Sequence, residues 1–222
     1  MSGAIFLGGG GSEHDERLLW DEIFEPGQRV VVWPFAQRDR VDRQRAGQWL
    51  LQTLSTRGVF GVDTWLDESR HLHELRGADA LVILGGNTFD LLAFLQQHDW
   101  LPAVGRFLDQ GGRVYGGSAG AILMGADIAV AGAMDPNDAG INDTRGLDLL
   151  AGCVVYPHYD PDHEQAAAEW ARRHRVTVIG IPEDAGVVVH GTTARNVGPG
   201  AIHIFSDGKH HTQPARAAWT LI

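Results

Sequence analysis

The stretch that decides the fold is Arg113-Val114-Tyr115-Gly116-Gly117-Ser118-Ala119-Gly120-Ala121-Ile122-Leu123-Met124. It begins as a short extended run, passes through a Gly-x-Ser-x-Gly element centred on Ser118, and ends as an apolar helical segment. Glycines two residues either side of a serine let a strand turn sharply into a helix, because side chains there would collide. The turn would expose the serine hydroxyl at the carboxyl end of a sheet. We therefore predict a nucleophile elbow at Ser118, although a glycine-rich turn without catalytic function has the same pattern.

Short apolar runs alternate with helical segments around this stretch. The expected strands are residues 4–7, 29–33, 59–65, 81–84 and 113–115, and the expected helices are residues 13–24, 39–56, 90–97 and 119–124. Runs such as 30–32 and 81–84 are apolar on both faces, which is typical of strands covered by helices on each side. After about residue 175 four strand-like runs follow at hairpin spacing, at 176–181, 186–190, 194–197 and 201–205. The sequence predicts one α/β domain over residues 1–222, with a mostly parallel sheet flanked by helices and C-terminal antiparallel edge strands.

Composition narrows the classes of function. The 222 residues are 44% hydrophobic, and 18 Lys and Arg face 28 Asp and Glu, for a formal charge of −10. A nucleic-acid or anionic membrane surface needs a basic patch, so neither partner is expected. The single cysteine, Cys153, can form no internal disulfide, and the first residues lack the basic and long apolar regions of a secretory signal. We expect a cytoplasmic protein that acts on small molecules or short peptides without a metal or cofactor.

A serine nucleophile needs a histidine base, and the chain has 11 histidines. His158 follows the apolar run 153–156, so we expect it at a strand end, on the rim where Ser118 also lies. His190 and His203 fall in or beside late strands and are expected to be structural. His210 and His211 are assigned to a polar tail. Placement therefore favours His158 as the base.

The carboxylate that orients the base is harder to choose. Glu183 follows the run 176–181 and precedes 186–190, again at a strand end, while Asp135, Asp143, Asp160 and Asp184 are rivals.

An oxyanion hole needs two convergent N–H groups, and we expect them from Ala119 and Gly86. Gly85-Gly86 also fits a plain strand-to-helix turn with Asn87 or Thr88 as the helix cap. The four glycines 8–11 lack Gly-x-Gly-x-x-Gly spacing, and we interpret them as a loop that approaches the site closely.

Four blocks of sequence together resemble the peptidase E and cyanophycinase family of serine peptidases. They are the blocks at 83–92, 117–121, 145–159 and 180–185, in the family's order, and the resemblance covers residues 4 to about 205. It implies a class I glutamine-amidotransferase-like fold, a Ser-His-Glu triad at Ser118, His158 and Glu183, and an oxyanion N–H from Gly86. It also implies that Asn87 faces the substrate, and we place Thr88 and Tyr159 with it as substrate-binding residues. The resemblance further suggests a homodimer.

One departure from the family pattern concerns specificity. Aspartyl dipeptidases that the chain resembles carry a Glu-Thr-Arg-containing segment after the catalytic histidine, whose arginine binds the substrate aspartate. Here the segment after His158 passes quickly into an expected helix at 166–174, and no arginine precedes Arg172. A buried aspartyl side chain without a cationic partner would lose solvation without compensation. We therefore expect a serine exopeptidase for short peptides that is not restricted to N-terminal aspartate.

Three other functions remain open at this point. The chain could be an aspartyl dipeptidase or cyanophycinase-like peptidase after all. It could be a small α/β-hydrolase esterase, whose order Ser…Asp…His would use Asp160 or Asp184 and then His203 or His210. It could also be a non-catalytic member of the fold that binds a peptide or metabolite.

Overall fold

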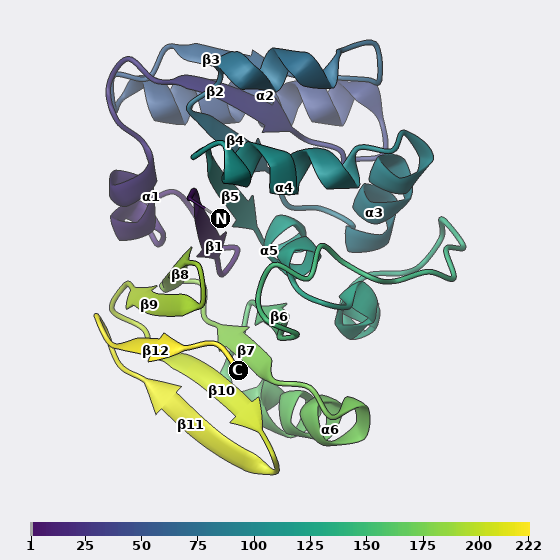
Figure 1. Ribbon diagram of the computed structural model, residues 1–222, viewed down its shortest axis with the longest axis vertical. Coiled ribbons are helices and arrows are strands. Elements are labelled where there is room, and N and C mark those ends of the chain that lie inside the picture. The colour runs from purple at the N-terminus through teal and green to yellow at the C-terminus, as the bar shows by residue number, and fades with distance from the viewer. Residues whose placement is uncertain (1) are drawn as a thin grey trace.

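The computed structural model describes residues 2–222 and contains two β-sheets (Figure 1). The strands of the main sheet are β1 (Ala4–Gly8), β2 (Arg29–Trp33), β3 (Gly61–Thr64), β4 (Ala80–Ile83), β5 (Arg113–Gly117), β8 (Gly186–His190), β9 (Thr193–Val197) and β12 (Ala218–Thr220). Their order is β12-β9-β8-β1-β5-β4-β2-β3. Strands β1 to β5 pair in parallel, and β8, β9 and β12 extend the sheet as antiparallel strands. The predicted α/β class with a mostly parallel sheet is confirmed.

The second sheet was not predicted. It is made of β6 (Val154–Pro157), β7 (Val178–Ile181), β10 (Ile202–Ser206) and β11 (Lys209–Gln213), in the order β11-β10-β7-β6. Strands β6 and β7 are parallel, and the other two pairs are antiparallel. The prediction that all late strands add to the edge of one sheet is therefore wrong for β7 and β10. His210 and His211 lie in β11 instead of a polar tail, because the exposed strand pairs along its length with β10.

Helices cover both faces of the main sheet because its strands are apolar on both sides. The helices are α1 (Arg17–Ile23), α2 (Arg40–Ser55), α3 (Thr88–Gln97), α4 (Leu101–Asp109), α5 (Ala119–Met124) and α6 (Glu164–His174), with 3₁₀ turns η1 (Leu72–Gly77), η2 (Ile128–Ala133) and η3 (Pro161–His163). Among residues 2–222 no helix has the length and apolar character that crossing a membrane demands.

Alternation along the parallel strands creates two hydrophobic cores. In β1, Phe6 packs with α1 and α2 on one face, whereas Ile5 and Leu7 belong to the core under α3, α4 and α5. That second core continues into β6, β7 and β10, so it joins the two sheets. Burying a Leu, Ile, Val or Phe side chain completely stabilises the folded state by about 1.5–3 kcal/mol. The two cores thus fix the carboxyl ends of β1, β4, β5 and β6 against one another.

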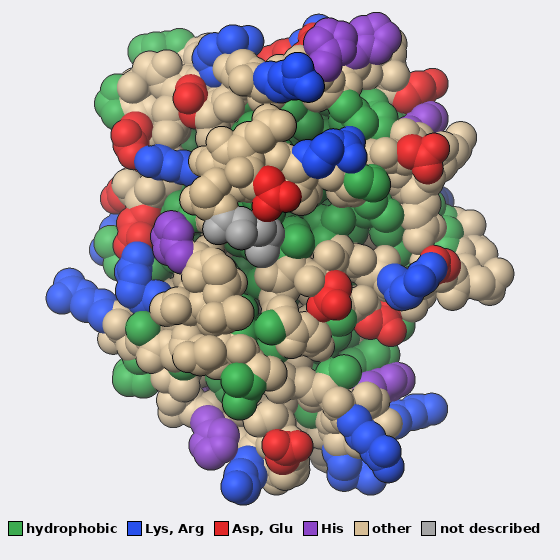
Figure 2. All heavy atoms as spheres, viewed as in Figure 1, with side chains coloured by type: hydrophobic (Ala, Val, Ile, Leu, Met, Phe, Trp, Pro, Cys, Tyr) green, Lys and Arg blue, Asp and Glu red, His purple; other side chains and the backbone are tan. Residues whose placement is uncertain are grey.

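Charged side chains contribute less than the cores to the stability of the fold. Figure 2 shows acidic and basic groups interspersed over one face of the molecule, and exposed pairs such as Arg38–Asp90 and Arg57–Asp21 join side chains from different elements. Such surface pairs typically contribute about 0–1 kcal/mol. The arrangement of the site described next therefore depends on the cores and on backbone contacts.

Candidate active site

Ser118 lies in the turn between β5 and α5, in a conformation unusual for a residue with a side chain. Its φ is 50° and its ψ is −112°. A Cβ on Gly116 would lie 2.4 Å from the Gly120 carbonyl oxygen, and one on Gly120 would lie 2.2 Å from the Ile83 carbonyl oxygen. Both framing glycines are required because backbone occupies the space of their missing side chains. The turn leaves Ser118 half-buried beside the end of β4.

His158 lies at the end of β6, where the chain also has a positive φ of 52°. Its Nε2 is 2.9 Å from Ser118 Oγ, and its Nδ1 is 2.8 Å from Glu183 Oε1. Glu183 follows β7, the parallel neighbour of β6. The side chains of His158 and Glu183 are 38% and 58% exposed, so peptide from solvent can reach this row of groups. The structure thus brings together the three residues that the sequence analysis proposed as a triad.

The glycine loop at residues 8–11 contacts each part of this row through backbone. Gly8 O accepts a long hydrogen bond from Ser118 N at 3.4 Å, and Gly9 O accepts one from His158 N at 2.8 Å. A Cβ on Gly10 would lie 2.3 Å from His158 Cε1, and one on Gly11 would lie 2.3 Å from the Glu183 carbonyl oxygen. Side chains on these glycines would displace the imidazole or the end of β7. The loop is therefore the surface on which His158 and Glu183 rest.

Gly86 and Ala119 carry the two proposed oxyanion N–H groups. A Cβ on neighbouring Gly85 would lie 3.2 Å from Ser118 Cβ, so the turn after β4 passes directly beside the serine. Gly86 has a φ of 139°, and a Cβ on it would lie 2.5 Å from the Ala36 carbonyl oxygen. Among residues 2–222 neither N–H donates a hydrogen bond to a protein acceptor. Both donors are free for a substrate oxygen.

The three proposed substrate-binding side chains have protein contacts of their own. Asn87 caps α3 by accepting from Asp90 N, and its amide donates to Pro136 O. Buried Thr88 donates from both N and Oγ1 to Asp135 Oδ2, at 2.8 and 2.6 Å. The Tyr159 ring packs against the second sheet, where its centroid lies 4.3 Å from the centroid of the His203 ring. These side chains lie around the site without joining the hydrogen-bonded row.

The rival acids are held elsewhere. Asp135 accepts from Thr88, as described above. Asp143 forms two hydrogen bonds with the Arg145 guanidinium, which lower the pKa of the carboxyl to about 2. Asp160 caps η3 by accepting from Asp162 N. A Cβ on Gly200 would lie 2.2 Å from Asp184 Oδ1, which places that carboxylate against the turn after β9.

His203, one of the two histidines that the esterase hypothesis would use as base, also has another partner. Its Nδ1 is 2.9 Å from His210 Nε2, and burial together with the charge of His210 lowers the pKa of His203. Of the histidines in residues 2–222, His158 is the one within hydrogen-bond distance of Ser118 Oγ.

One residue near the site was missed. Glu16 lies just before α1, and its side chain is buried beneath the glycine loop. Nothing in the sequence selects it, since Glu13, Asp15, Glu16 and Arg17 together look like the exposed, charged start of the helix expected at 13–24. Its hydrogen-bond donors, Gly10 N, Trp20 Nε1 and the Tyr115 hydroxyl, are brought to it only by the fold.

Comparisons with known proteins agree on the family. The model of peptidase family S51 matches residues 1–197. A peptidase E of Escherichia coli is 26% identical over 224 residues, covering 94% of this chain and 93% of the relative. A Drosophila melanogaster protein named probable alpha-aspartyl dipeptidase is 27% identical over 222 residues, with 94% and 89% covered. A peptidase E of Pasteurella multocida is 28% identical, over 62% of each chain.

A solved structure of a peptidase from an acI-B1 actinobacterium has a TM-score of 0.73 at 18% identity, over 99% of this chain and 97% of that one. This likeness supports the fold, while the family match supports the activity. The chain belongs to peptidase family S51 and is a serine-type peptidase.

Proposed function

We propose that Ser118, His158 and Glu183 form a catalytic triad that hydrolyses short peptides through an acyl-enzyme on Ser118. The observation that carries this proposal is the continuous row of hydrogen bonds from Ser118 Oγ through the His158 ring to Glu183 Oε1, with distances of 2.9 and 2.8 Å. Such a row lets an imidazole take the serine proton while a carboxylate fixes its tautomer. Relatives named peptidase E and probable alpha-aspartyl dipeptidase support cleavage of short peptides.

In the first half of the reaction Ser118 Oγ attacks the peptide carbonyl carbon while its proton moves to His158 Nε2. The negative charge of Glu183 at Nδ1 stabilises the imidazolium that results. The carbonyl oxygen becomes an oxyanion and accepts hydrogen bonds from Gly86 and Ala119 N–H, which have no competing acceptor within residues 2–222. His158 then gives its proton to the leaving amine, and the C–N bond breaks.

In the second half a water molecule takes the place of the leaving amine. His158 removes a proton from this water, the hydroxide attacks the ester carbonyl, and the same two N–H groups stabilise the second oxyanion. Return of the proton to Ser118 Oγ releases the acid and restores the enzyme. Asn87, Thr88 and Tyr159 remain proposed substrate-side residues; of the three, Tyr159 has a buried side-chain atom without a hydrogen-bond partner among residues 2–222.

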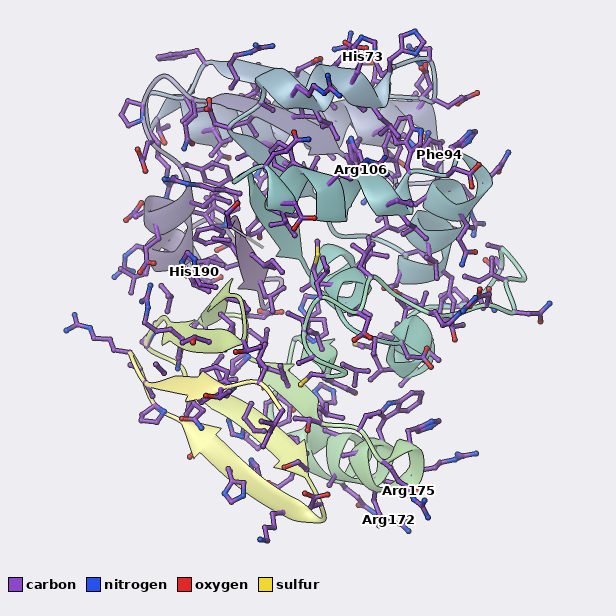
Figure 3. All side chains as sticks on the ribbon, viewed as in Figure 1. His73, Phe94, Arg106, Arg172, Arg175 and His190 are labelled. Carbon is purple, nitrogen blue, oxygen red and sulfur yellow. The ribbon has the colours of Figure 1, made fainter. Side chains whose placement is uncertain are left out.

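We further propose that cleavage does not require an N-terminal aspartate. The first arginine after His158 is Arg172, and Figure 3 places Arg172 and Arg175 at the outer end of α6, on the outside of the molecule. Arg145 is engaged by Asp143, and Arg38 binds Asp90 through two nitrogens. A bidentate guanidinium is the usual partner of a carboxylate, and these guanidinium groups are already paired or distant.

The test compares kcat/KM for Asp-Leu, Ala-Leu, Leu-Leu and matched tripeptides, with Ser118→Ala as the control. We expect cleavage of several dipeptides and loss of about 10⁶ in kcat in the variant, because the nucleophile is gone. A fluorophosphonate probe should label wild-type protein at Ser118. Absence of both labelling and peptide cleavage would favour the non-catalytic reading. A preference for Asp-Leu of about 100-fold, or about 2.7 kcal/mol, would restore the aspartyl dipeptidase reading.

A further inference from the structure

Glu16 is a carboxylate buried within the fold, with 2% of its surface exposed. Its Oε1 accepts a hydrogen bond from Gly10 N at 2.8 Å. Its Oε2 accepts from Trp20 Nε1 at 3.0 Å and from the Tyr115 hydroxyl at 2.5 Å. Burial raises the pKa of this carboxyl, and the three hydrogen bonds act against the shift. The surroundings are otherwise apolar, with Trp20, Tyr115 and Phe24 packed edge to face or tilted.

Glu16 and His158 lie on opposite sides of the glycine loop. Gly10 lies between the two side chains: its N–H is bound by Glu16, and a Cβ on its other side would lie 2.3 Å from His158 Cε1. A Cβ on Gly8 would lie 2.4 Å from the Glu16 carboxylate. The carboxylate therefore supports the glycine loop from below while the imidazole rests on it from above. The next residue of the loop, Gly9, binds His158 through its carbonyl oxygen.

We propose that Glu16 is a positioning residue for His158, acting through Gly10 and the loop at residues 8–11; this role rests on the proposed triad. A buried carboxylate costs free energy unless its hydrogen bonds are complete. The core between α1 and the main sheet would be as well filled by an apolar side chain. What an apolar side chain cannot supply is an acceptor for Gly10 N–H, which fixes a loop that has no side chains of its own.

The chemistry of the pocket requires a carboxylate at this position. Gly10 N–H and Trp20 Nε1–H are obligate donors, and they bind different oxygens of Glu16. The amide of glutamine offers one acceptor oxygen and one donor nitrogen. Whichever way it is turned, one of the two N–H groups would face another donor. Oε2 accepts from both Trp20 and Tyr115, so the amide oxygen should take its place and the amide nitrogen should face Gly10 N–H. Glu16→Gln is isosteric and should release the loop.

The experiment measures how fast a fluorophosphonate probe, at saturating concentration, labels Ser118, and to what final extent. The extent counts folded sites, whereas the rate constant reports how well His158 activates the serine. We expect Glu16→Gln to keep the extent and to lower the rate constant about 10- to 100-fold, since small misplacements of catalytic groups have effects of this size. Exposed Glu13 offers the matched control, and Glu13→Gln should behave as wild type.

Tyr115→Phe removes one donor to Oε2 but leaves Gly10 bound to Oε1. It should lower Tm while keeping the rate constant, and this separates loop positioning from stability. If Glu16→Gln does not fold, the triple change Glu16→Leu, Trp20→Phe, Tyr115→Phe makes the core apolar and still frees Gly10. It should show the same slow labelling.

Each outcome is decisive. A wild-type rate constant in Glu16→Gln or in the triple variant would overturn the positioning role, and so would a loss of extent with an unchanged rate constant. Equal slowing in Tyr115→Phe and Glu16→Gln would show that Glu16 acts through stability alone. No labelling of wild-type protein would overturn the triad, and the role of Glu16 with it; labelled wild type with an unaffected Glu16→Gln would overturn only the latter.

Discussion

Ser118 and His158 both have a positive φ, 50° and 52°, and their side chains meet at 2.9 Å between Oγ and Nε2. Neither residue is a glycine, and each such conformation typically costs about 1–3 kcal/mol. The two residues follow strands of different sheets, β5 and β6. Strain at both ends of one hydrogen bond is the pattern expected where function, and not stability, sets the backbone.

The first prediction separates His158 from His203. His158→Ala should lower kcat by about as much as loss of the serine, on the order of 10⁶, because His158 is the base that the described residues 2–222 place at Ser118 Oγ. His203→Ala should retain most of the activity, since His203 pairs with His210. The measurement is kcat for the dipeptide that wild type cleaves best. The opposite ranking would support the esterase reading with its late histidine.

The second prediction concerns the acid of the proposed triad. Glu183→Gln should lower kcat by about 10⁴ with little change in KM. The imidazolium forms only in the transition state, so the missing negative charge of Glu183 affects that state and not substrate binding. Asp135→Asn is the comparison: its carboxylate binds Thr88, so we expect an effect on KM and a loss of about 1 kcal/mol in stability. A larger kcat effect for Asp135→Asn would move the third triad position away from Glu183.

Several strands could be predicted from the sequence because burial on both faces leaves a clear signal. The apolar runs at 29–33 and 81–84 match β2 and β4, and both contribute side chains to the two cores. The run at 153–156 looks the same in sequence, yet β6 pairs in the second sheet. Apolar character reports burial, and it carries no information on which strand is the neighbour. The division of the strands into two sheets could therefore not be predicted from the sequence.

Two helices, α1 and α4, also differ from what the sequence predicts. The helix expected at 13–24 begins only at Arg17, because Glu16 turns its side chain inward to Gly10 and Tyr115. Helix α4 was not predicted, since Gly105 lowers its helix propensity, although Val104, Phe107 and Leu108 are buried. His158 could be selected because it follows a strand, whereas Glu183 stayed one of several candidate acids until the family resemblance favoured it. Glu16 could not be selected, because only the folded chain brings it under the glycine loop.

A third prediction follows from the burial of Cys153. The thiol is 1% exposed, and burial, with a smaller contribution from the charge of Asp148, raises its pKa to about 11. At pH 8 the thiolate fraction should be about a thousandth, so iodoacetamide should react slowly with native protein and completely in urea. Mass spectrometry of timed samples measures this. Fast alkylation of native protein would mean that the start of β6 opens to solvent.

The last prediction tests the contact between the glycine loop and the imidazole. Gly10 has a φ of +93°, and its missing Cβ would lie 2.3 Å from His158 Cε1. Gly10→Ala should therefore push the ring away from Ser118 and lower kcat about 100-fold, in addition to the backbone cost of a left-handed alanine. Gly27→Ala is the matched control, since Gly27 has a φ of +83° with nothing within 4 Å of its missing Cβ. Both variants should lose similar stability, about 1 kcal/mol by thermal unfolding, but only Gly10→Ala should lose activity. Equal kcat values in the two variants would show that the imidazole does not rest on Gly10 in the working enzyme.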